Sequence, residues 1–195
     1  MALPESFLQI SNRVRNWGRW GDDDQLGTLN FITPEVVRNA AGCIRTGESF
    51  PLSVTLEQEG IQVGFIPGRI NPILEMISID EPIDAEAGPD SFHTSDDVIQ
   101  MGLQAATHWD GLCHASYNGF VYNGYSSETI TSNEGATRCG IENLRTVCSR
   151  GVLLDVARAK EVDVLDCPYA ITAKDLDEAA AMGNVEIKSG DIVLA

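Results

Sequence analysis

Two of the three histidines in the sequence lie close together, in the run Q-A-A-T-H-W-D-G-L-C-H from Gln104 to His114. Residues 97–107 are predicted to form a strand that leads into this run, and side chains alternate between the two faces of a strand. Gln104, His108 and Asp110 then share one face. An imidazole nitrogen beside a carboxylate oxygen suits a borderline divalent ion such as zinc or manganese. The spacing therefore makes His108 and Asp110 candidate metal ligands.

His114 is a candidate general acid or base. Gly111 lets the chain turn, so that His114 can return to the same site, and an imidazole titrates close enough to neutrality to shuttle protons. The alternative is that His108 and Asp110 form an ordinary hydrogen-bonded pair, because a paired His and carboxylate is only a candidate site. A nucleophile made of Cys113 and His114 is disfavoured, because sequence neighbours in an extended chain point in opposite directions.

The pattern Q-x-A-T-H-W-D-x-x-x-H resembles the H-x-G-T-H-x-D-x-x-x-H signature of the metal-dependent cyclase family. This family includes bacterial arylformamidase (kynurenine formamidase) and isatin hydrolase. Other segments resemble family segments in the same order: Trp17-Gly18, 24–30, 33–35 and 150–155. The resemblance implies an α/β protein with the swivelling β/β/α fold and a central mixed sheet. It also implies one cyclase-like domain over 1–195, with an N-terminal arm and loop over 1–33, and a homo-oligomer, dimeric or higher.

The resemblance further implies a chemistry. His108 and Asp110, with Gln104 at the position of the family's first histidine, are expected to ligate Zn²⁺ or Mn²⁺, and His114 to act as the catalytic acid/base. The expected activity is hydrolysis of small N-acyl or cyclic amides. Hydrolysis of a lactone or ester with the same site is an alternative, as is a non-catalytic homologue or fragment that binds a small molecule or a partner chain.

Two departures from the family pattern affect this expectation. A glutamine amide at Gln104 is a neutral and weaker zinc ligand than imidazole. The family also takes a His and a Glu from a C-terminal region, and no histidine follows His114. Residues 188–195 turn into an apolar strand on which the sequence stops, which predicts a C-terminally truncated fold. We expect that last strand to be an unpaired edge and the metal to bind weakly.

Aromatic residues near the motif are candidates for binding substrate. The tryptophans of the Gly- and Asp-rich loop 16–30 either cover a pocket or anchor the loop on the core. The aromatic residues of 117–125, where two Asn-Gly steps predict a hairpin, either line the pocket or pack in the core. We select Trp20, Trp109 and Tyr122 as candidate substrate-binding residues.

The elements that position these residues follow from periodicity and capping. Thr33 and Pro34 are typical of a helix start, and Thr172 with Asp175 forms a capping box. The predicted helices are 7–16, 33–47, 137–146 and 172–182, and the predicted strands are 48–58, 73–80, 97–107, 150–156 and 188–195. Asp22 to Asp24 lack the spacing of a calcium loop and predict a solvated turn. His93, in a polar loop, is expected to be exposed and is left out of the site.

Composition limits the partners and the compartment. A net charge of −16 disfavours nucleic acid and anionic membranes, because their phosphates are repelled. Five cysteines without a C-x-x-C step, and a start without a basic and apolar leader, predict reduced thiols in a cytoplasmic protein. No stretch approaches the ~20 apolar residues of a membrane span.

Overall fold

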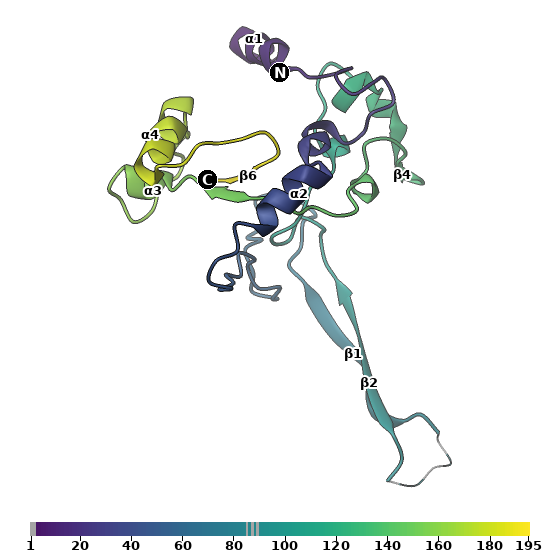
Figure 1. Ribbon diagram of the computed structural model, residues 1–195. Coiled ribbons are helices and arrows are strands. Elements are labelled where there is room, and N and C mark those ends of the chain that lie inside the picture. The colour runs from purple at the N-terminus through teal and green to yellow at the C-terminus, as the bar shows by residue number, and fades with distance from the viewer. Residues whose placement is uncertain (1–2, 85, 87, 89) are drawn as a thin grey trace. The chain divides into compact units, whose positions relative to one another are not determined.

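The computed structural model describes residues 3–84, 86, 88 and 90–195 (Figure 1). Contacts divide the chain into two compact units, one made of Met1–Gly47 with Gly111–Ala195 and the other of Glu48–Asp110. Helices and strands both occur, which confirms the predicted α/β class. In the described part of the chain, no helix is long and apolar enough to cross a membrane.

The first unit begins with two amphipathic helices. Helix α1, Glu5–Val14, lies where a helix was expected. Helix α2, Pro34–Ala41, starts as predicted, with the Thr33 side chain accepting a hydrogen bond from the backbone N–H of Val36 at 3.3 Å. The expectation that α2 continues to Gly47 is wrong. The helix ends at Ala41, with Gly42 as its C-cap. Ile44, predicted on its apolar face, is 74% exposed, so no packing supports further turns.

A small core in the same unit lies among the segments between Gly151 and the end of the sequence. Strand β5, Gly151–Leu153, pairs in parallel with β6, Ile192–Leu194. Helices α3, Val156–Ala159, and α4, Ala173–Gly183, contact each other. The core residues are Val152, Leu154, Val156 and Ala179. The expected unpaired last strand is therefore paired on one side, and within the described residues β5 is its only strand partner.

The predicted capping box opens α4. The Thr172 side chain accepts from the backbone N–H of Asp175, and the Asp175 carboxylate accepts in return from the N–H of Thr172 at 2.7 Å. Asp175 is buried and also binds the Lys160 ammonium at 2.5 Å and the Tyr169 hydroxyl at 3.0 Å. The Lys160 partner and the capping bonds hold the pKa of Asp175 well below its usual range.

The rest of the first unit is a loop-rich layer with short elements. They are the 3-10 helices Gly27–Phe31, Leu112–His114, Tyr122–Gly124, Ser127–Thr129 and Ile141–Asn143 and the paired strands β3, Ile130–Thr131, and β4, Gly135–Ala136. Cys113, Val121 and Cys139 form its core. Asn118 and Asn123 both have a positive φ, each followed by a glycine with positive φ, which confirms the turns predicted from the two Asn-Gly steps.

The second unit is built around an antiparallel hairpin. Strands β1, Ile73–Pro82, and β2, His93–Gln100, place Leu74 opposite Ile99. The strand predicted at 73–80 is confirmed. The strand predicted at 97–107 ends at Gln100.

The strand predicted at 48–58 is not formed. In that segment the backbone N–H of Val54 donates to the Thr107 hydroxyl at 3.0 Å. Within the described residues no strand pairs with this segment, and β-branched content alone does not make a strand where no backbone partner is available.

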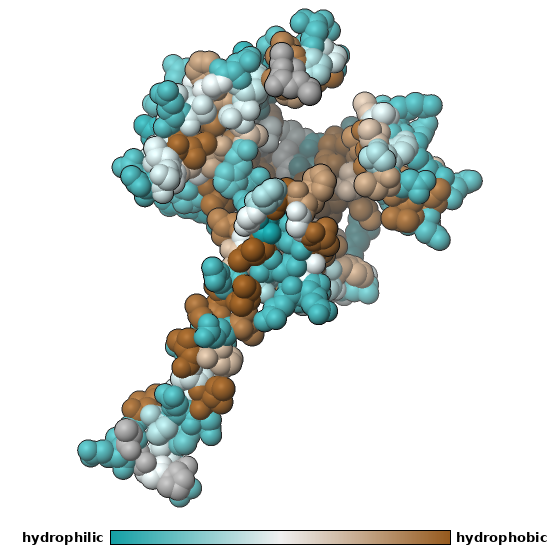
Figure 2. Space-filling model, turned by 180° about the vertical axis from the view of Figure 1, so that it is seen from behind, coloured by the Kyte–Doolittle hydropathy of each residue, from teal (hydrophilic) through white to brown (hydrophobic). Residues whose placement is uncertain are grey.

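The strands form three two-stranded sheets within the described residues, instead of one central mixed sheet. The hairpin of β1 and β2 leaves large aliphatic side chains exposed, as Figure 2 shows. Ile77 is 61% exposed, Ile79 70% and Val98 48%. Much of the apolar surface on this hairpin is therefore exposed among the residues that the structure describes.

Candidate functional site

The candidate metal ligands all belong to the second unit; Gln104 lies in a turn, and His108 and Asp110 follow it in irregular backbone. Strand β2 ends at Gln100, and a turn follows, closed by a hydrogen bond of 3.0 Å from the N–H of Ala105 to the carbonyl of Gly102. The prediction that Gln104, His108 and Asp110 share one strand face is therefore wrong. Ala105 and the residue after it are buried, so the turn is anchored by its two small side chains.

A glutamine from a distant loop holds this turn. The Gln62 side-chain amide donates to the carbonyl oxygens of Gln104 and Ala105, at 3.0 and 3.3 Å. Gln62 is fixed in turn by Asn71, which accepts from its N–H at 2.9 Å and donates to its carbonyl at 3.0 Å. Sequence reasoning missed Gln62, because it lies 42 residues from Gln104 and belongs to no motif.

His108 is oriented by its own backbone. Its Nδ1 lies 2.7 Å from the carbonyl oxygen of Ala106. A carbonyl can only accept, so Nδ1 carries the hydrogen of this bond, and Nε2 keeps its lone pair when the ring is neutral. In metal-binding histidines, the ring nitrogen that does not bind the metal usually donates its N–H to a carbonyl or carboxylate in this way. The side chain is exposed, so Nε2 is accessible to a ligand. His108 therefore fits the metal role.

Gln104 is half-buried and Asp110 is exposed, on either side of His108 in sequence. Asp110 provides a carboxylate and Gln104 an amide oxygen, both suitable for a divalent cation. Among the residues that the structure describes, no three His, Cys, Asp or Glu side chains come together as a metal-binding group. The candidate donors in and after the turn are therefore one imidazole, one carboxylate and one amide.

His114 belongs to the first unit, at the end of the 3-10 helix Leu112–His114, and its side chain is exposed. Its backbone N–H donates to the carbonyl of Gly111, which fixes the start of its side chain. Cys113 is buried, and its N–H donates to the carbonyl of Cys139 at 3.0 Å. Burial raises the pKa of the Cys139 thiol to about 11. Cys113 and Cys139 are thus core residues of the first unit.

Two of the three aromatic candidates pack within the first unit. Trp20 contacts Phe31 edge to face, with 5.1 Å between ring centroids. The Tyr122 hydroxyl donates to Asp24 at 2.7 Å, and burial together with this carboxylate raises the Tyr122 pKa. Trp109, in the second unit, is 59% exposed. The structure thus gives Trp20 and Tyr122 packing partners and leaves Trp109 accessible.

Asp24 does not lie in a solvated turn, as was predicted for the three aspartates. It is half-buried, and its carboxylate accepts from the N–H of Gly27 at 2.9 Å and from the Asn30 amide at 2.7 Å, besides Tyr122. The Asn123 side chain closes the same loop by donating to its carbonyls. The D-x-x-G-x-x-N spacing was the available signal, since a short side chain readily binds nearby backbone N–H groups.

His93 is also less exposed than expected. It lies in β2, and its Nδ1 contacts the carbonyl oxygen of Asp80 at 2.9 Å and the Asp80 carboxylate at 3.2 Å. Its side chain is 27% exposed. His93 thus contacts Asp80 of the opposite strand.

Comparison with known proteins identifies the family. Residues 29–195 match the family model described as "Putative cyclase". A solved structure described as the crystal structure of a novel cyclase is 38% identical in sequence and superposes with a TM-score of 0.81. The match covers 92% of this chain and 60% of that chain, so this chain spans less than two thirds of its neighbour's length. No curated protein matches. The chain belongs to the cyclase family.

Proposed function

We propose that the protein is a metal-dependent hydrolase of small N-acyl or cyclic amides. The observation that carries this proposal is the contact between His108 Nδ1 and the Ala106 carbonyl, which presents Nε2 as a ligand atom. Membership of the cyclase family supports it, because the motif that contains His108 resembles that family's metal-binding signature.

His108 Nε2 and an Asp110 oxygen are the residues that would hold Zn²⁺ or Mn²⁺, with the Gln104 amide oxygen as a weaker third donor. A bound divalent ion makes water more acidic and polarises the amide carbonyl. Gln62 keeps the turn in place by its bonds to two turn carbonyls. The loss of conformational entropy on ordering the turn then occurs during folding and does not weaken metal binding.

His114 would move the proton that amide hydrolysis requires. An amine leaves poorly as an anion, so a group that protonates the leaving nitrogen is needed, and imidazole is suited to that near neutral pH. His114 lies four residues after Asp110 in sequence and is exposed. In a lactone or ester the leaving group is an alcohol oxygen, which is less basic than an amine nitrogen. Its departure needs less help from His114, so the same residues can also hydrolyse such a substrate.

A non-catalytic role is the second candidate, and two observations favour it. Within the described residues no three strong metal ligands gather, and Gln104 replaces the histidine of the family signature. In this role the protein would bind a small molecule or a partner chain without turnover.

Metal analysis with matched variants separates the two candidates. The purified chain is reconstituted with Zn²⁺ or Mn²⁺ and assayed on small N-acyl amides, cyclic amides and lactones. His108→Ala is expected to lose metal and hydrolysis, whereas His93→Ala, in the same unit, keeps both. Less than about a tenth of an equivalent of metal in the reconstituted chain, a fraction far below one catalytic site, would establish the non-catalytic role.

The aromatic candidates Trp20, Trp109 and Tyr122 are proposed to contact the substrate. Trp109 has the accessible ring face that an aromatic or cyclic amide can stack on. Trp109→Ala is expected to raise KM for aromatic substrates more than for aliphatic ones. An equal change for both classes would remove Trp109 from the substrate site.

We further propose that the chain acts as a homo-oligomer, dimeric or higher. The exposed aliphatic side chains of the hairpin support this, because an isolated two-stranded hairpin is only marginally stable and large apolar patches mark interfaces. Sedimentation of the wild type beside Ile79→Asp tests it. A wild-type monomer at micromolar concentration would contradict the proposal.

A further inference from the structure

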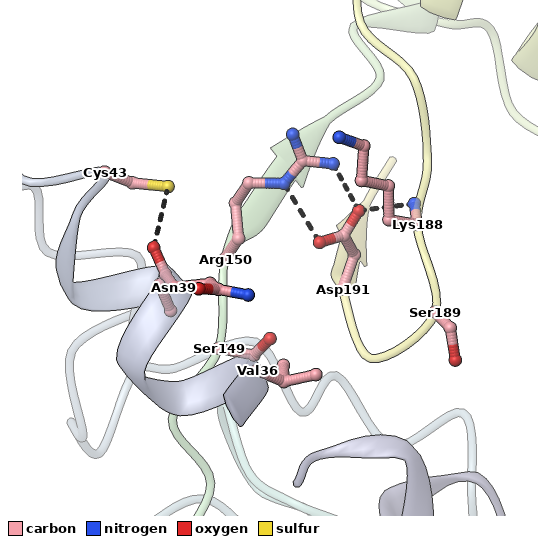
Figure 3. A pocket seen from close by; sticks show the side chains of 9 residues that line it. Val36, Asn39, Cys43, Ser149, Arg150, Lys188, Ser189 and Asp191 are labelled. Atoms are coloured by element: carbon pink, nitrogen blue, oxygen red, sulfur yellow. Dashed lines mark hydrogen bonds and ion pairs between the residues drawn. The ribbon is translucent and has the colours of Figure 1, made fainter. Parts of the chain in front are cut away.

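A second site lies in the first unit, away from the metal-binding motif in sequence. A cavity of about 310 Å³ has α2 and Cys43 on one side and the residues just before β5 and β6 on the other (Figure 3). These residues are Ser149, Arg150, Lys188, Ser189 and Asp191. The cavity's volume is at the lower end of the range for small-molecule sites. We call it the Arg150 pocket.

Arg150 is held rigidly at this pocket by Asp191. Its Nε donates to Asp191 Oδ1 at 2.9 Å and its Nη2 to Oδ2 at 2.5 Å, and Nη2 also donates to the Glu186 carbonyl at 2.6 Å. The Asp191 side chain is 6% exposed, and Oδ2 accepts in addition from the N–H of Lys188 at 2.6 Å. The guanidinium plane is therefore fixed before any ligand arrives, and Asp191 has little capacity left for other donors.

Two cationic groups keep unused donors at the pocket. The Nη1 group of Arg150 and the Lys188 ammonium have no hydrogen-bond acceptor within the described residues. In Figure 3 both side chains extend to the same side of the Asp191 carboxylate. Both also lower the pKa of Asp191 through their positive charge. The lining thus holds two cations and one carboxylate, in a chain whose net charge is −16.

We propose that the Arg150 pocket binds a small organic monocarboxylate. One carboxylate oxygen accepts from Arg150 Nη1 and the other from the Lys188 ammonium, which are the strong, charge-assisted donors that such a group selects. Val36 and Ala40 of α2 offer apolar contact to the organic part. A single carboxylate matches the one surplus positive charge of the lining, whereas a doubly charged phosphate exceeds it.

Titration of the ¹⁵N-labelled 195-residue chain with benzoate, benzamide and inorganic phosphate tests the proposal. Benzoate is expected to shift the amide signals of residues 188–191, and benzamide, which has the same shape without the charge, is not. Lys188→Ala should weaken benzoate binding about 10- to 100-fold, the usual effect of losing a charged hydrogen bond. Lys188 is exposed, so the fold should be kept. Lys174→Ala, an exposed lysine on α4, is the matched control and should leave binding unchanged.

Alkylation of Cys43 gives a second readout that does not depend on Lys188. Cys43 lines the pocket and is exposed. Because Cys148 and Cys167 are exposed as well and would also react, the experiment uses the Cys148→Ser, Cys167→Ser background. Benzoate should slow the reaction of Cys43 with iodoacetamide. The proposal is overturned if benzamide or phosphate binds as well as benzoate, if no probe binds, or if Lys188→Ala and Lys174→Ala behave alike.

Discussion

Replacing Leu154 by Ala tests the small core beneath β5 and β6. Leu154 is 1% exposed and packs with Val152, Val156 and Ala179. Alanine removes three carbon atoms, which costs about 2.4 kcal/mol of transfer free energy at ~0.8 kcal/mol per group. The cavity left behind adds to this cost, so the free energy of unfolding should fall by about 2–5 kcal/mol. This core is small, and little neighbouring structure can collapse into the space.

The neighbouring Leu153 is a control with identical chemistry. It is 64% exposed, so Leu153→Ala should cost less than about 1 kcal/mol, in proportion to the smaller area that folding buries. Urea unfolding followed by circular dichroism measures both variants. Equal destabilisation by the two substitutions would show that Leu154 is no better packed than Leu153, and would refute the packing described above.

The remaining predictions concern the turn, the proton carrier and the ion pair. Gln62→Ala should lower metal affinity or activity about 10- to 100-fold, as for other residues that orient metal ligands, with little change in the far-ultraviolet circular dichroism. His114→Ala should keep metal content near wild type while hydrolysis falls ~10²–10⁴-fold, and Asp110→Ala should lose both; equal metal loss would show that the roles are misassigned. The Arg150 guanidinium lowers the pKa of Asp191, so this carboxylate contributes stability above its ordinary pKa of 3.8, and the contribution is lost as the pH falls below that value. Asp191→Asn should flatten the stability profile below pH 3.8 in urea titrations, and an unchanged profile would contradict the assigned ion pair.

Local sequence determined the features that depend on near neighbours. Thr33 with Pro34 predicted the start of α2, and Thr172 with Asp175 the capping box of α4, because each cap joins atoms within three residues. The Asn-Gly steps predicted left-handed turns for the same reason. The motif around His108 also indicated the family, because residue types at a fixed spacing can be recognised without knowledge of the fold.

Tertiary structure decided which strands form and what holds the candidate site. Residues 48–58 have strand-like composition and remain irregular, because a strand needs a backbone partner that composition does not provide. The sequence predicts a strand before His108, but the structure has a turn there, held by Gln62, which sequence spacing does not connect to it. The Arg150 pocket likewise joins segments more than a hundred residues apart. Contacts of this kind depend on which distant segments pack together, and packing is a property of the folded chain that no local pattern encodes.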